Sequence, residues 1–202
     1  PTLSLKIDDL QHPASSLFLT HLFPPHALRT ALTTALTHLY LTPRAAPTHV
    51  RSIALILRPM DGVAYTTGTH DAKQIHLSCA HVVGAHEAGR CKEECEGVLV
   101  HEVVHCFQHN AMGTAPAGLI EGIADYVRLR AGLAPPHWTP GRRADGWDAG
   151  YATTGLFLDW LERRYGGGTV AALNAALAEG GWDEGVVEGV TGRKVGRLWE
   201  IY

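Results

Sequence analysis

Two histidines and a glutamate stand in the pattern His-Glu-x-x-His, at His101, Glu102 and His105. Apolar residues around this pattern recur with helical spacing, so we expect it to lie inside a helix. Residues four apart in a helix differ by about 40° in direction and by about 6 Å in height, so both imidazoles project from one face. Two neutral imidazoles on one face can bind a zinc ion. Glu102 points about 100° away, where it can accept a proton from a water at the ion.

A catalytic zinc site needs a third protein ligand and one open position. The next predicted helix supplies Glu121 and, four residues later on the same face, Asp125. We expect Glu121 to be the third ligand and Asp125 to accept the ring N–H of a histidine ligand, with His101 as its partner. The competing interpretation is a helix with two surface histidines beside an unrelated ion-pairing helix.

Other ligand sets fit the sequence less well. In the metzincin motif the His-Glu-x-x-His pattern is followed by a glycine and a histidine, at positions where this chain has Gln108 and Ala111. His109 lies eight residues after His101, about 12 Å along a straight helix, so a site with three histidines is strained. A deformylase-like site would use Cys95, but the glycine-rich motif of that family is missing. Two histidines and a carboxylate also suit copper or nickel, although we expect zinc.

The order of predicted elements, strands first and helices after, favours an α+β fold in a single domain over residues 1–202. The strand-rich part covers about residues 1–90 and forms a small sheet, and the helical part covers about residues 91–202. Apolar alternation and β-branched runs predict four strands, at Leu3–Asp8, Val50–Leu57, Val63–Thr67 and Gln74–Ser78. Helical periodicity predicts a helix opened by Pro24 and stopped by Pro43, then Lys92–His109, Leu119–Ala131, Tyr151–Tyr165, Val170–Leu177 and a short helix ending near Tyr202, with a loop over Ala134–Asp145.

Composition excludes several classes of protein. The 202 residues include 17 Lys and Arg against 20 Asp and Glu, a net charge of −3, which argues against a nucleic-acid partner held by bulk electrostatics. The longest aliphatic stretch is about six residues, far short of the roughly 20 that a membrane-spanning helix needs. We expect a monomer. The chain begins at Pro1 with no leader pattern, so we expect a segment to have been removed or omitted, and the compartment is left open.

Several motifs together resemble the basic secretory protein family, which is regarded as a group of zinc metallopeptidases. They are Gly97–His105, Gln108–Asn110, Gly118–Leu129, Trp147–Tyr151 and Thr154–Leu161. The resemblance implies a zincin-like pair of active-site helices in the gluzincin arrangement, with His101, His105 and Glu121 as ligands and Glu102 as base. It also implies a peptide or protein substrate, and its name suggests secretion.

Hydrolysis of a peptide also needs a donor for the oxygen of the attacked carbonyl. We expect Tyr151, because it opens a helix after Gly150 and is similar to the tyrosine that opens a helix in aminopeptidase gluzincins. The alternative is that Tyr151 is a packing residue, and Tyr126 is a weaker choice because it points away from the ligand face. By analogy with the fold, Gln74–Ser78 is expected to be the edge strand against which an extended peptide lies.

The four cysteines are too few for a disulfide scaffold. A bridge from Cys79 to Cys91 or Cys95 is the first expectation. A second structural zinc held by these three cysteines with His81 and His86 is a less favoured one, and buried free thiols are the remaining possibility. We expect Cys106 to be a buried free thiol.

The function that this sequence favours is zinc-dependent hydrolysis of peptide bonds, with Glu102 as general base and then general acid. The alternative is a non-catalytic metal-binding interaction or defence protein that uses the same cleft. The intact set of ligands and base favours the enzyme.

Overall fold

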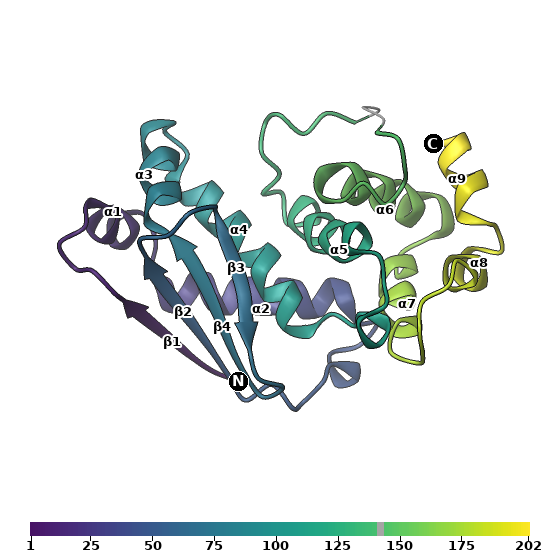
Figure 1. Ribbon diagram of the computed structural model, residues 1–202, viewed down its shortest axis with the longest axis horizontal. Coiled ribbons are helices and arrows are strands. Elements are labelled where there is room, and N and C mark those ends of the chain that lie inside the picture. Colours follow the sequence, from purple (N-terminus) through teal and green to yellow (C-terminus); the bar gives the residue numbers. More distant parts are fainter. Residues whose placement is uncertain (141–143) are drawn as a thin grey trace. The chain divides into compact units, whose positions relative to one another are not determined.

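The computed structural model describes residues 1–140 and 144–202, which form an α+β fold (Figure 1). The chain forms two compact units. The first comprises residues 1–34 and 47–106, and the second comprises residues 35–46 and 107–202. The α+β class is confirmed, whereas the single domain over residues 1–202 remains a prediction.

A four-stranded mixed sheet forms the centre of the first unit (Figure 1). Its order is β1 (Thr2–Ile7), β2 (Ser52–Arg58), β4 (Ala72–Ser78) and β3 (Ala64–Gly68). β1, β2 and β4 run parallel, and β3 is antiparallel to β4. The near-continuous aliphatic sequence of β2, with Ile53, Leu55 and Leu57 fully buried, suits its place between two parallel neighbours.

The prediction that Gln74–Ser78 lies at the edge of the sheet is wrong. These residues belong to β4, which pairs with β2 on one side and with β3 on the other. Pairing on both sides accompanies burial of the C-terminal half of the strand, where Ile75, His76 and Leu77 are buried and the His76 ring stacks on Tyr65 of β3. The edge strand on this side of the sheet is β3, at Ala64–Gly68.

Three helices accompany the sheet in the first unit: α1 (Pro13–His21), α3 (Cys79–Glu87) and α4 (Cys91–Phe107). α1 and α3 were not predicted. α3 follows β4 without a loop, and the Ser78 hydroxyl caps it by accepting a hydrogen bond from the His81 backbone N–H at 3.5 Å. α4 carries the His-Glu-x-x-His pattern, and its buried valines and leucine fix it in the core of this unit.

The second unit is helical. It contains α5 (Ala117–Arg130), α6 (Tyr151–Tyr165), α7 (Thr169–Ala176), α8 (Gly185–Thr191), α9 (Val195–Ile201) and the turns η1 (Pro43–Ala45) and η2 (Ala111–Gly113), while α2 (Pro24–Leu39) contributes residues to both units. α5 and α6 pack closely (Figure 1). The helices predicted from periodicity are present, although α4 ends at Phe107 rather than His109 and α8 was missed. Residues 141–143 of the predicted loop lie outside the described residues. In the part of the chain that the structure describes, no helix has the length and apolar character needed to cross a membrane.

Candidate metal centre

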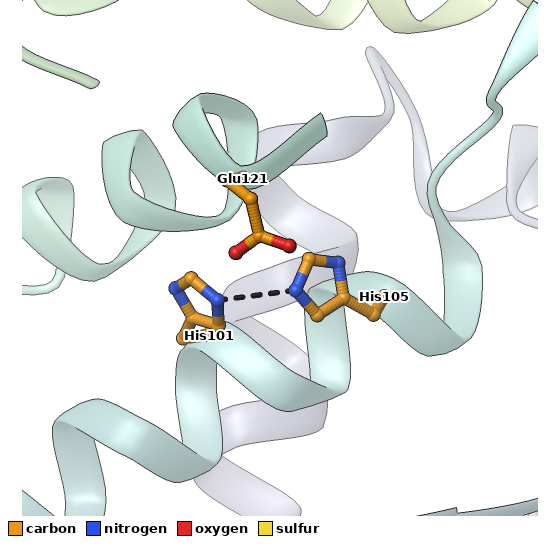
Figure 2. A group of neighbouring side chains, drawn as sticks. All are labelled: His101, His105 and Glu121. Atoms are coloured by element: carbon orange, nitrogen blue, oxygen red, sulfur yellow. Dashed lines mark hydrogen bonds between the residues drawn. The ribbon is translucent and has the colours of Figure 1, made fainter. Parts of the chain in front are cut away.

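His101 and His105 stand one turn apart on α4. Their Nε2 atoms are 3.1 Å apart, and the ring planes are nearly perpendicular, at 83°. Figure 2 shows a ring nitrogen of each histidine facing that of the other. His101 is buried and His105 is half-buried. Two imidazole nitrogens at this separation can both donate lone pairs to one metal ion.

Glu121 on α5 completes a group of three possible ligands. One ligand atom from each of His101, His105 and Glu121 lies within 4.8 Å of the others, and Figure 2 shows the carboxylate facing the two rings. It is the one such group of three or more residues among those described. Two imidazole nitrogens and a carboxylate oxygen form a donor set that suits zinc, so these residues fit a metal ion.

The position of Glu121 depends on close contacts between α5 and the segment that precedes α6. A Cβ atom added to Gly118 would lie 1.7 Å from the backbone oxygen of Asp148, so only glycine fits there. A Cβ atom added to Gly150 would lie 4.0 Å from the Cβ of Glu121. The side chain of Gln108 donates a hydrogen bond to the carbonyl of Ile120 at 3.2 Å, which ties the turn after α4 to the residue before Glu121.

Glu102 is buried, at 5% exposure, and its carboxylate faces β3. The Thr66 hydroxyl lies 2.7 Å from Glu102 Oε2 and 2.9 Å from the Glu102 backbone oxygen. Thr66 is not among the site residues that the sequence predicts. Alternation along β3 is the signal that could have found it, because Ala64 and Thr66 share the less exposed face of the strand.

Asp125 is buried on α5, at 3% exposure. A Cβ atom added to Gly155 of α6 would lie 3.1 Å from the Cβ of Asp125, so α6 packs directly against this residue. The burial suits a carboxylate that orients a ligand, and its hydrogen bond to His101 remains a prediction.

Tyr151 begins α6 in an unusual backbone conformation. Its φ is +44°, and the preceding Gly150 has a φ of +90°. A positive φ is rare for a bulky residue and costs of order 1–3 kcal/mol, and such residues cluster at functional sites. Tyr151 is 61% exposed, so burial of its ring does not account for this conformation.

A family model described as "Peptidase of plants and bacteria" matches residues 1–202, the whole chain. The chain belongs to this peptidase family. The resemblance to the basic secretory protein family is thereby confirmed, and membership implies a peptide or protein substrate. No curated protein and no solved structure matches the chain.

All four cysteines of the chain are buried free thiols, so the predicted bridge from Cys79 to Cys91 or Cys95 is not formed. The Cys91 thiol instead donates to the Val82 carbonyl at 3.9 Å. Burial raises the pKa of Cys79, Cys91 and Cys95, which disfavours the thiolate that a metal needs. These cysteines form no second metal group of three or more ligands among the described residues. Cys106 is a buried free thiol as predicted, and burial raises its pKa to about 12.

His109 lies beyond the end of α4 and does not continue the row of histidines. Its backbone N–H donates to Asn174 Oδ1 at 2.9 Å, and its ring packs edge-on against Tyr40. Burial lowers the pKa of His109. Within the described residues it is not part of the group that could hold a metal ion.

Proposed function

We propose that this member of the peptidase family hydrolyses peptide bonds with a zinc ion held by His101, His105 and Glu121. The observation that carries the proposal is the convergence of these three ligand atoms within 4.8 Å, with Glu102 adjacent to His101 in the sequence. Bound there, zinc would supply Lewis-acid polarisation of the peptide carbonyl and would lower the pKa of water.

Glu102 is the proton carrier in this proposal. Its carboxylate takes a proton from the attacking water and later delivers it to the nitrogen of the leaving amine. Its burial suits this work, because a water-poor environment strengthens each hydrogen bond that the carboxylate makes. Asp125 holds the orientation of His101 by accepting its ring N–H.

Tyr151 donates a hydrogen bond to the carbonyl oxygen on which negative charge develops. Two features support this role: the strained backbone at the start of α6 and the close approach of Gly150 to Glu121. The exposed phenol of Tyr151 is accessible to a substrate.

The substrate peptide lies along β3 in an extended conformation. Hydrogen bonds from Ser78 N to the Val63 oxygen and from Thr69 N to the Ala72 oxygen fix the antiparallel pattern at the two ends of β3. Because the direction of the backbone groups alternates along a strand, the N–H and C=O of Thr66 point away from β4, toward the open edge. An added strand would pair with these groups.

Removal of the metal is expected to abolish hydrolysis reversibly. Treatment with a chelator should eliminate cleavage of a peptide library, and one equivalent of zinc should restore it, because the residues of the chain alone supply no Lewis acid. The measurement is mass spectrometry of the library digest before chelation, after it and after addition of zinc. Full cleavage by metal-free protein would contradict the proposal. Zinc binding without any cleavage would favour a non-catalytic metal-binding interaction.

The variant Tyr151→Phe is expected to lower kcat about a hundredfold, the effect typical of losing one donor to the developing oxyanion. The substitution keeps the ring and removes only the hydroxyl, so zinc content and thermal stability should match the wild type. Steady-state kinetics on a cleaved library peptide measure the effect. Unchanged kcat would make Tyr151 a packing residue and leave the oxyanion donor unassigned.

A further inference from the structure

The Thr66 hydroxyl is the one hydrogen-bond donor to the Glu102 carboxylate among the described residues. It lies 2.7 Å from Oε2, the usual length of an O–H···O hydrogen bond. Thr66 belongs to β3 and Glu102 to α4, and both lie in the first unit, so the contact joins the edge strand to the helix that carries the metal ligands.

This contact gives the two oxygens of the Glu102 carboxylate different roles. A threonine hydroxyl has one hydrogen, and when that hydrogen is donated to Oε2 it fixes the torsion of the carboxylate. The other oxygen, Oε1, is then left to accept a proton from water. Thr66 Oγ1 is also 2.9 Å from the Glu102 backbone oxygen, so the hydroxyl contacts both ends of the same residue.

The backbone N–H and C=O of Thr66 face the open edge of the sheet rather than Glu102. Thr66 is opposite Ile75 in the register of β3 and β4, at a position where the N–H and C=O point toward the open edge. No backbone hydrogen bond outside the sheet reaches Thr66 among the described residues. The side chain of Thr66 therefore contacts Glu102, the proposed base, while its backbone N–H and C=O face the position that an added strand would occupy.

We infer that Thr66 is a positioning residue, which holds Glu102 in register with the peptide that pairs with β3. The inference rests on the proposed function. It assigns the orientation of the base to a hydroxyl on the substrate-binding strand rather than to the metal ligands.

Two variants separate the hydroxyl from the backbone. Thr66→Val removes the hydroxyl but keeps the shape and the outward N–H and C=O, so kcat should fall about 10- to 100-fold while KM stays within about twofold. Thr66→Ser should recover kcat to within about threefold of the wild type, because it restores the donor. Thr20→Val, at an exposed position of α1 where the hydroxyl donates to the Ser16 carbonyl at 2.8 Å, is the matched control and should leave both constants unchanged.

The position of Glu102 supplies a readout that does not depend on activity. In a crystal of Thr66→Val the carboxylate should leave its wild-type position, while bound zinc is unchanged. Wild-type kcat in Thr66→Val, or a carboxylate that keeps its position in that crystal, would overturn the inference. Absence of hydrolysis by the zinc-loaded wild type would instead refute the proposed function and the inference with it.

Discussion

Glu102→Gln is expected to lose about a thousandfold in kcat while it binds zinc as tightly as the wild type, because general acid–base groups contribute about 10²- to 10⁴-fold. Glutamine has nearly the shape of glutamate, and it can still accept the hydrogen bond that Thr66 donates at 2.7 Å. What it lacks is the basic oxygen that takes the proton from water. Steady-state kinetics on a cleaved peptide, together with zinc analysis of the same sample, measure both parts of this prediction.

A matched control for Glu102 is Glu96, which lies on the same helix six residues earlier and outside the group proposed to bind the metal. Glu96→Gln removes a carboxylate of the same chemistry and should leave kcat unchanged. Wild-type turnover by Glu102→Gln would show that another group carries the proton. Loss of zinc from this variant would show that Glu102 helps to bind the ion.

The second large effect is expected from Gly122→Ala, in the contact between α5 and α6. The added Cβ would lie 2.2 Å from Thr154 Cγ2 and 2.4 Å from Thr154 Cβ. Thr154 is fully buried, and its hydroxyl accepts from the Gly150 N–H at 2.9 Å and donates to the Trp147 oxygen at 2.7 Å. In the variant, overpacking and the resulting distortion of these two hydrogen bonds should lower the free energy of unfolding by about 3 kcal/mol.

The consequence for Gly122→Ala is a melting temperature lower by roughly 9 °C, measured by calorimetry. Affinity for zinc should fall as well, because Gly122 follows Glu121 and Thr154 holds the segment that contains Gly150. Gly189→Ala on α8 is the control, since an added Cβ meets nothing within 4 Å there. It should be neutral or stabilising by up to about 1 kcal/mol. Equal stability of the two variants would refute the role given to the contact.

Local periodicity was sufficient to predict the part of the site that lies on single helices. Residues four apart on a helix share a face whatever surrounds them, so the pairing of His101 with His105 follows from spacing alone. The placement of Glu121 also depends on the turn between the helices. That turn includes Ala111 and Met112, with φ of +53° and +55°, a left-handed conformation that residue preferences do not predict for alanine and methionine.

The contacts that depend on tertiary packing could not be predicted. Alternation identifies a strand but not its neighbours, so it does not show that β4 pairs on both sides. The bond from Thr66 to Glu102 joins residues 36 positions apart and exists only because α4 packs on β3. Cysteine counts likewise do not determine pairing, because buried thiols and bridges leave the same composition.

Zinc content per chain, measured by mass spectrometry after dialysis, tests the central claim most directly. The structure supplies a control pair, because His21 Nε2 and His86 Nδ1 are 3.0 Å apart on other helices. The wild type and the double variant His21→Ala, His86→Ala should each retain about one zinc, whereas folded His105→Ala and Glu121→Ala should retain almost none. Wild-type zinc content in both of these single variants would contradict the assignment of His105 and Glu121 as ligands.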